Sequence, residues 1–325
     1  MADRSFKEYI GSRFYDQFFN AIKSYVIQNR HNIELSSRTV SSPDYAELSD
    51  FTIKSVGIDD RDGMEVAFDV LAEAEVYVKE HHRHHDVDEN TCFPWFILSC
   101  TADLSRNMDD LCIHRVEQYS QRNKQNKPLS DSLVPISYKI DLDKIATEFL
   151  RKHYPEALRT PMPVDPMVLA DRLGLSVVTQ ELTEDFSVFG QIFFQDCDTE
   201  VFNSDTGKME VTHFPAKTIV VDPKAFLLRN LGSVNNTIVH ECVHWDQHRK
   251  AFELERLYNR DATQIKCLVI GGSKGSSDRT AADWMEWQAN CLAPRIQMPI
   301  GSFKTKAAEY VRKFQREMNA THIID

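Results

Sequence analysis

Three polar residues inside an otherwise apolar segment carry the most specific chemistry of this sequence. They belong to His240-Glu-Cys-Val-His244, which follows Thr237-Ile-Val and precedes Trp245. Residues four apart on an α-helix are about 40° apart around its axis, so the two imidazoles can face one ion. Glu241 lies beside them, where it can act on a water molecule bound to that ion. The pattern predicts a zinc-dependent hydrolase, with His240 and His244 as ligands and Glu241 as the catalytic residue.

A competing interpretation is an amphipathic helix whose polar face happens to read His-Glu-x-x-His. The apolar residues on both sides of the motif favour a helix that is buried on most sides. Two histidines and a glutamate are costly in such a helix unless a metal ion or hydrogen bonds satisfy them. The metal site is therefore the favoured interpretation.

A zinc site with two histidines needs a third protein ligand and an open position for water. The segment 278–295 is predicted to be helical as far as Pro294, and Glu286 lies in its middle with alanines at −4, +3 and +7. Such a stripe of small side chains lets another helix approach closely, which would bring Glu286 to the ion. Asp283, one turn earlier, is the competing ligand or a partner of a ligand histidine. We expect Glu286 to be the ligand.

Several further motifs occur in a defined order around this site. They are Pro163–Gly174, Gly190-Gln-Ile, Thr218–Asp222, Glu286–Asn290, Leu292-Ala-Pro and Met298-Pro299. With these motifs, the sequence from about residue 140 to about residue 300 resembles the ImmA/IrrE-type metallopeptidases.

This resemblance implies a zincin-like α+β fold in which His240, His244 and Glu286 bind zinc and Glu241 is the catalytic acid/base. It also implies the role of the family, which is the cleavage of a helix-turn-helix repressor. Members of the family often carry more helical sequence after the Met-Pro segment than the 26 residues that follow it here. We therefore transfer no C-terminal function from the family.

Composition limits the classes of protein and of partner. The 325 residues suffice for two domains, and 42% hydrophobic with 27% charged residues is ordinary for a globular protein. The net charge of −11 argues against direct nucleic-acid binding and suits a basic protein partner, such as a DNA-binding repressor.

The sequence indicates a cytoplasmic protein without a membrane partner. The N-terminus has no apolar signal region, and no run approaches the roughly 18 apolar residues of a membrane span. The seven cysteines show no CxxC spacing and are expected to be reduced thiols.

We expect an N-terminal domain over 1–120, made of one helix and an antiparallel sheet, and a polar linker over 121–136. The helix covers 5–28, and alternation predicts a hairpin at Asp59–Gly63. The strands flanking the hairpin cover 51–58 and 64–70, and 73–80 continues as strand. Two more strands cover 93–104 and 111–119.

The second domain, 137–325, is expected to be the metallopeptidase domain of an α+β protein. Its predicted helices cover 141–158, 165–173, 233–249 and 302–318, and its predicted strands cover 176–180, 190–195 and 217–221. A long connection is expected from Lys250 to Ser277. Lys217–Val221 is predicted to be an exposed edge strand with which a peptide substrate pairs.

Other candidate residues are weaker. The segment His81–His85, with Asp86 and Asp88, could bind a second metal, but a solvated loop is favoured. His248 is expected to be a surface histidine rather than a residue that orders the site or stabilises an oxyanion. His213 and Tyr258 are no stronger candidates, so the sequence identifies no oxyanion stabiliser.

Three functions compete at this point. The favoured one is a zinc endopeptidase that acts on a regulatory protein. The alternative is a non-proteolytic regulatory binding protein with a structural or sensory zinc site. The third is a hydrolase of a non-peptide amide or another small substrate. Glu241 favours hydrolysis, because a structural site has no need of a base.

Overall fold

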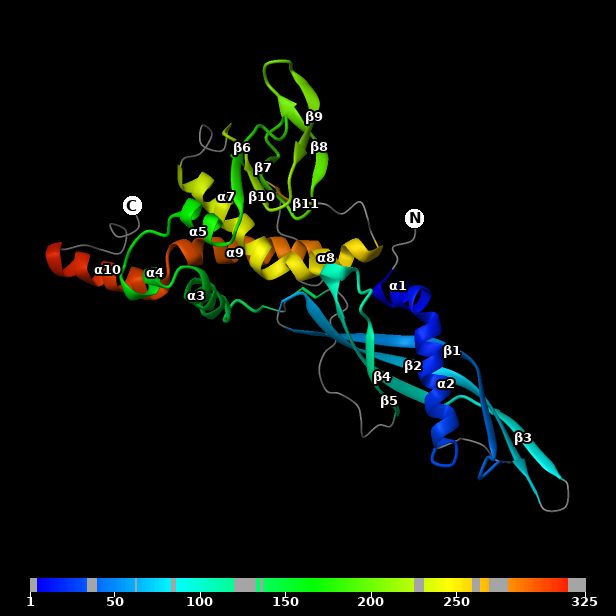
Figure 1. Cartoon of the computed structure of the whole chain (residues 1–325). Coiled ribbons are helices and arrows are strands. Elements are labelled where there is room, and N and C mark those ends of the chain that lie inside the picture. The colour runs from blue at the N-terminus through cyan, green and yellow to red at the C-terminus, as the bar shows by residue number, and fades with distance from the viewer. Residues whose placement is uncertain are drawn as a thin grey trace. The chain divides into compact units, whose positions relative to one another are not determined.

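The computed structural model describes residues 5–33, 40–61, 63–82, 86–119, 133–134, 137–224, 231–258, 264–268 and 280–314. The chain divides into two compact units. The first comprises Met1–Leu133 and Lys250–Asp261, and the second comprises Val134–Arg249 and Ala262–Asp325. Helices and strands together make a mixed α+β protein with an antiparallel sheet, in agreement with the expected class (Figure 1). Most of the predicted linker, 121–136, lies outside the described residues.

The first unit contains an antiparallel sheet of long strands. Their order is β1 (Tyr45–Asp60), β2 (Glu65–His81), β4 (Trp95–Asp103) and β5 (Cys112–Gln118), and β3 (Val87–Cys92) also pairs with β2. Alternate residues of β2 and β4 are buried, as in a sheet with one well-covered face. The predicted hairpin is confirmed, since β1 and β2 pair on either side of a turn in which Gly63 has a φ of 70°.

Two helices, α1 (Phe6–Arg13) and α2 (Tyr15–Asn29), occupy the segment 5–28, so the prediction of one helix is wrong. Phe14 leaves the helical region, with φ −114° and ψ 18°, and its buried ring lies edge-on to that of Phe18. The helical spacing of the aromatic residues persists across this break, which is why the periodicity does not show it. The apolar faces of both helices join the buried face of the sheet in one core.

The segment 73–80 continues the strand that begins at 64–70, as predicted, and both belong to β2. One other strand of this sheet differs from the expectation. Strand β3 was not predicted, because Val87–Cys92 is largely polar and most of its residues have considerable exposure. A strand at the margin of a sheet needs little hydrophobic patterning, so its sequence gives a weak signal.

The second unit contains a four-stranded sheet in the order β11 (Gln264–Leu268), β7 (Val188–Phe193), β10 (Thr218–Val221) and β6 (Ser176–Thr179). Strand β10 runs parallel to β6 and antiparallel to β7. The prediction of an exposed edge strand at Lys217–Val221 is therefore wrong. All four residues of β10 are buried and paired on both sides, which explains the short, continuous apolar run.

A separate two-stranded hairpin, β8 (Cys197–Asn203) and β9 (Lys208–Phe214), was not predicted. Most residues of β9 are exposed, so the hairpin lacks the alternation of a half-buried strand. Gly207, with a φ of 66°, lies in the turn that joins the two strands.

The helices of the second unit place the candidate residues. They are α3 (Leu142–His153), α4 (Glu156–Arg159), α5 (Pro166–Arg172), α7 (Leu231–Val243), α9 (Ala281–Gln297) and α10 (Ile300–Phe314). Helix α7 contacts β7 and β10 of the sheet and also α5 and α9. The helix predicted over 141–158 is divided at Tyr154, because Pro155 follows and a helix usually ends before a proline.

Helix α7 continues directly into a π-turn, η3 (His244–His248), and then into α8 (Arg249–Tyr258). The predicted long connection from Lys250 is therefore wrong in its first part, which is helical and groups with the first unit. Leu254 of α8 belongs to the core of that unit. In the portion of the chain that the structure describes, no helix combines the length and apolar character that crossing a membrane requires.

Candidate metal centre

The motif residues lie at the end of α7 and the start of η3, and this part of the chain is buried on nearly every side. The stretch Thr237–Val243 is entirely buried, and His240, Glu241 and His244 are 0% exposed. Apolar residues around the motif pack against the sheet and the neighbouring helices, as the sequence indicates. Buried polar groups of this kind are costly without hydrogen bonds or a ligand. The contacts of each polar atom therefore decide what the site can do.

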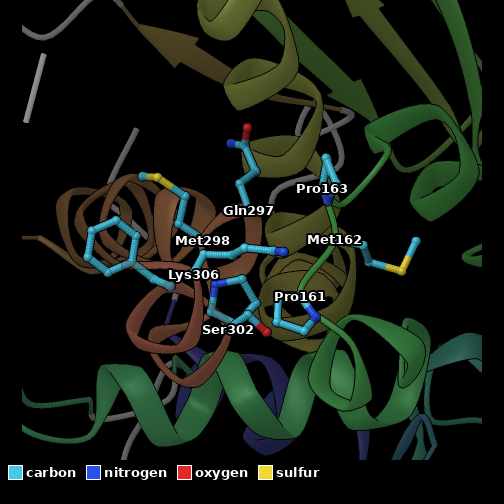
Figure 2. Close-up of a pocket in the computed structure, with 9 residues that line it drawn as sticks. Pro161, Met162, Pro163, Gln297, Met298, Ser302 and Lys306 are labelled. Atoms are coloured by element: carbon cyan, nitrogen blue, oxygen red, sulfur yellow. The ribbon is translucent and has the colours of Figure 1, made fainter. Parts of the chain in front are cut away.

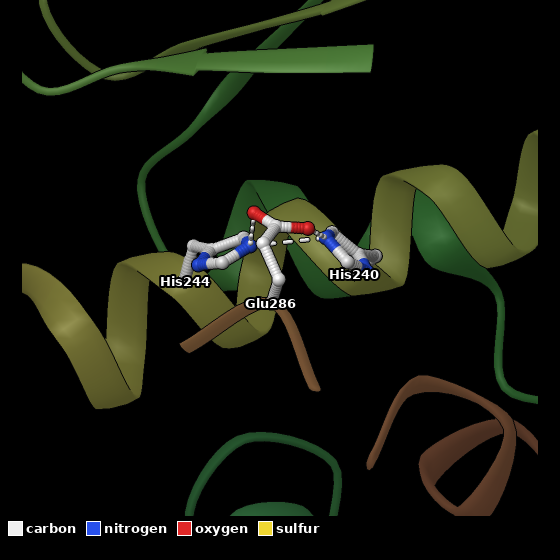
Figure 3. A group of neighbouring side chains, drawn as sticks. All are labelled: His240, His244 and Glu286. Carbon is white, nitrogen blue, oxygen red and sulfur yellow. Dashed lines mark hydrogen bonds and ion pairs between the residues drawn. The ribbon is translucent and has the colours of Figure 1, made fainter. Parts of the chain in front are cut away.

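Three side chains from two helices converge at this place (Figure 3). The Nε2 atoms of His240 and His244 are 3.0 Å apart. One carboxylate oxygen of Glu286 lies 3.4 Å from Nε2 of His240, and the other lies 3.2 Å from Nε2 of His244. Among the described residues, these three form the group that could hold a metal ion, with ligand atoms within 4.8 Å of one another.

The spacing of these atoms is compatible with one bound metal ion. Ligand atoms at about 2.0–2.1 Å from a tetrahedral ion such as zinc are about 3.3 Å from one another. The two histidine nitrogens are 3.0 Å apart, and each lies 3.2 or 3.4 Å from a different oxygen of Glu286. Oε1 of Glu286 is also buried without a hydrogen bond, which leaves this oxygen available to a cation.

Glu286 and Asp283 both belong to α9, but only Glu286 contacts the two histidines. The carboxylate of Asp283 accepts hydrogen bonds from the backbone N–H and the hydroxyl of Thr280, at 2.9 Å each, in a capping box at the helix N-terminus. Asp283 is therefore occupied at the cap, whereas Glu286 reaches the histidines. Ala289 and Ala293 are buried and Ala282 is exposed, so only part of the predicted alanine stripe packs inside.

The electrostatics of the three ligands suit a cation. Burial lowers the pKa of His244, which keeps its imidazole in the neutral form that binds metals. Burial alone would raise the pKa of Glu286, but the two imidazoles beside it lower this pKa to about 2. The site thus offers the neutral imidazole of His244 and the ionised carboxylate of Glu286 at neutral pH.

Glu241 is enclosed and has no hydrogen-bond partner on either carboxylate oxygen. Burial, and to a lesser extent the carboxylate of Glu286, raise its pKa well above the ordinary value. Strand β7 comes very close at this point, because a Cβ atom added to Gly190 would lie 2.3 Å from Cγ2 of Thr237 and 3.3 Å from Oε1 of Glu241. Gly190 therefore lets the sheet approach the helix where the catalytic candidate lies.

Replacing Gly190 with alanine is expected to lower the free energy of unfolding by about 1–3 kcal/mol, because the added methyl group overlaps the side chain of Thr237. Urea unfolding measures the change. The double variant Gly190→Ala/Thr237→Ser, which lacks the obstructing Cγ2 atom, should recover most of the loss, and Thr237→Ser alone is the control. No recovery in the double variant would show that this contact does not limit the approach of β7.

His248 is not the surface histidine expected from the sequence. Its side chain is fully buried, and its Nδ1 atom lies 2.9 Å from Nδ1 of His244. Its Nε2 atom lies 2.7 Å from Oε1 of Gln288 on α9. Burial and the neighbouring His244 lower the pKa of His248 to about 3. In the sequence, the only sign that His248 contacts His244 is the spacing of four residues between them. Nothing in the sequence distinguishes Gln288 as the partner of His248.

The π-turn that holds His244 and His248 is fixed to α3 through Asp246. One oxygen of this buried carboxylate accepts from Nε2 of His153 and from Nζ of Lys152, both at 2.8 Å. Burial would raise the pKa of Asp246, but these two hydrogen bonds outweigh it and lower the pKa from 3.8 to about 2. π-Turns are common at functional sites, and this one is held by the hydrogen bonds of a buried carboxylate to His153 and to the exposed Lys152.

Replacing Asp246 with asparagine is expected to lower the free energy of unfolding by about 2 kcal/mol near neutral pH. A carboxyl whose pKa is depressed by folding stabilises the protein above the unfolded pKa of 3.8, and this contribution disappears as the pH falls towards about 2. Urea unfolding at several pH values should show the difference between the two proteins shrinking in acid. Asp143→Asn, which removes an exposed ion pair with Arg295, is the control and should have little effect. A difference that does not change with pH would contradict this role.

The other candidates from the sequence do not belong to this group. His81 pairs with Asp44 and His82 with Asp88, whereas the rest of that segment, 83–85, lies outside the described residues. His213 is exposed on β9 and pairs with Asp198. Tyr258 lies in α8, within the first unit. Within the described ranges, none of these joins a metal-capable group.

A small apolar cavity of about 260 Å³ lies where α9 is followed by α10 (Figure 2). Its lining includes Pro161–Pro163 on one side and Gln297–Pro299 with Phe303 on the other. None of its lining residues belongs to the group of His240, His244 and Glu286. The cavity is therefore distinct from the candidate metal centre.

Comparison with known proteins does not identify a family for this chain. A scan against protein-family models, a search of curated proteins and a search of solved structures each found no match to the chain.

Proposed function

We propose that this chain is a zinc-dependent endopeptidase of the ImmA/IrrE type, with a zincin-like metallopeptidase domain formed by its second unit. The observation that carries the proposal is the convergence of His240, His244 and Glu286 on one point, with the unpaired carboxyl of Glu241 next to it. A buried acid without hydrogen bonds is costly, which favours a chemical use for it. A purely structural zinc site needs the three ligands but has no use for Glu241.

In this proposal, Nε2 of His240, Nε2 of His244 and the carboxylate of Glu286 hold the ion. Bound zinc supplies a Lewis acid that polarises the scissile carbonyl and lowers the pKa of a water molecule to about 7. Glu241 takes a proton from this water as the water oxygen bonds to the carbonyl carbon. Glu241 then gives the proton to the nitrogen as the carbon–nitrogen bond breaks, which yields a carboxylic acid and an amine.

The proposed substrate is a regulatory protein, such as a DNA-binding repressor. The net charge of −11 supports a basic partner, because repressors often carry positive charge for DNA. Six cysteines of the described residues form no disulfide, which supports a reducing compartment such as the cytoplasm; they are Cys92, Cys100, Cys112, Cys197, Cys242 and Cys291. Since β10 is an inner strand, a substrate cannot pair with it as the sequence had suggested.

The first test is the metal content of the purified chain, measured by elemental analysis on wild type and on His240→Ala. About one zinc per wild-type chain, and little in the variant, is the expected result, because two of three ligands cannot hold the ion tightly. The same zinc-loaded protein is then incubated with a peptide library, and cleavage is followed by mass spectrometry. A wild type that binds no supplied zinc would contradict the proposal. Zinc binding without cleavage of peptides or of candidate repressors would favour the regulatory binding protein.

A further inference from the structure

Behind the candidate metal centre, a line of buried side chains runs from His244 to helix α9. Nδ1 of His244 meets Nδ1 of His248 at 2.9 Å, and Nε2 of His248 meets Oε1 of Gln288 at 2.7 Å. His244 and His248 are 0% exposed and Gln288 is 2% exposed, so bulk water does not compete for these bonds. Helix α9 thus supplies both Glu286, which contacts the Nε2 atoms of the two motif histidines, and Gln288, which contacts His248.

With Oε1 of Gln288 facing His248, these contacts favour one arrangement of hydrogens. Oε1 of Gln288 can only accept, so Nε2 of His248 carries a hydrogen. A fully buried imidazole favours its neutral form, which has a single N–H, so Nδ1 of His248 accepts a hydrogen bond. Nδ1 of His244 must then be the donor. Nε2 of His244 is left without a hydrogen, with its lone pair directed to the side of His240 and Glu286.

The reverse arrangement would disable the site. If the amide of Gln288 turned round, its NH₂ group would donate to His248, and each hydrogen in the line would move to the other ring nitrogen. Nε2 of His244 would then carry a hydrogen and could not bind a metal ion. The orientation of one glutamine side chain therefore decides whether His244 can act as a ligand.

We propose that His248 and Gln288 are positioning residues that hold His244 in the tautomer able to bind metal through Nε2. The purpose of this arrangement rests on the proposed zinc site, but the tautomer itself is a property of the metal-free protein. Residues that orient a ligand histidine typically change the metal affinity by about 10–100-fold when they are removed. The same size of effect is expected here.

The test uses the full chain with Gln288→Met, which keeps the approximate size but removes the acceptor, and with Gln288→Glu, which keeps an acceptor at the same place. Nitrogen-15 NMR of the histidine rings reports the tautomers in metal-free protein, and competition with a chelator reports the zinc affinity. Gln297→Met is the matched control, because it removes a glutamine from the same helix outside the site. Thermal unfolding of each variant shows whether it is folded.

In metal-free wild type, the hydrogen of His244 is expected on Nδ1. Gln288→Met should give a mixture of tautomers and a zinc affinity lower by about 10–100-fold, whereas Gln288→Glu and Gln297→Met should stay close to wild type. A hydrogen on Nε2 of His244 in metal-free wild type would overturn the proposal. So would a folded Gln288→Met protein that keeps the wild-type tautomer and affinity. A wild type that binds no zinc would overturn the proposed function instead, and the NMR result would still decide the tautomer.

Discussion

Replacing Glu241 with glutamine is expected to lower peptide-bond hydrolysis by about 1000-fold or more while zinc binding is unchanged. Glutamine has almost the same size but cannot take a proton from water. The substitution should also leave the fold intact, because burial raises the pKa of Glu241 and so favours its uncharged form in the metal-free protein. The loss of activity would then reflect the missing proton transfer alone.

This result is measured as the rate of cleavage of a peptide that the wild type cuts, alongside the zinc content of both proteins. Glu148→Gln, which makes the same change at an exposed position on α3, is the control and should keep the wild-type rate. If Glu241→Gln retains near-normal turnover with normal zinc content, another residue is the base. If it loses zinc, Glu241 has a role in holding the metal.

Replacing Glu286 with alanine should have the second large effect, a loss of zinc affinity of at least about 100-fold. Loss of a direct ligand costs more than loss of an outer residue, for which about 10–100-fold is typical. The carboxylate of Glu286 lies within 3.4 Å of Nε2 of His240 and within 3.2 Å of Nε2 of His244, so its removal leaves only two nitrogens. Competition with a chelator of known affinity gives the measurement.

Asp283→Ala is the matched control, because it removes the nearest other carboxylate of the same helix. It should keep the zinc affinity close to wild type and lower the free energy of unfolding by about 1 kcal/mol, since Asp283 belongs to the cap of α9. The reverse ranking of the two variants in the zinc titration would move the ligand from Glu286 to Asp283.

The sequence predicted the grouping of His240, His244 and Glu286 better than the strands around them. The reason is that these predictions depend on residues close together in the sequence. His240 and His244 are related by one turn of one helix, so their spacing alone places them together. Glu286 was predicted from a helix of its own with small residues beside it, and two of these, Ala289 and Ala293, are indeed buried. Each of these inferences uses the geometry within a single helix.

The features that were missed depend on packing between segments distant in sequence. The inner position of β10 follows from its pairing with β7 and β6, which no pattern within Thr218–Val221 reveals. The polar or exposed strands β3 and β9 lack the alternation that marks a half-buried strand. The burial of His248 depends on Gln288, 40 residues further along the chain, so its role was open until the fold brought the two helices together.

The origin of the ligands on two helices also bears on folding. An ion bound by His244 and Glu286 would act as a cross-link between positions 42 residues apart, since 286 − 244 = 42. By the chain-entropy relation used for disulfides, an unfolded chain that kept the ion on both residues would lose about 4 kcal/mol of loop entropy. Zinc would therefore bind the assembled site more tightly than the open chain, and the folded population would rise with the free zinc concentration. The lifetime of the folded protein would then depend on the supply of the ion.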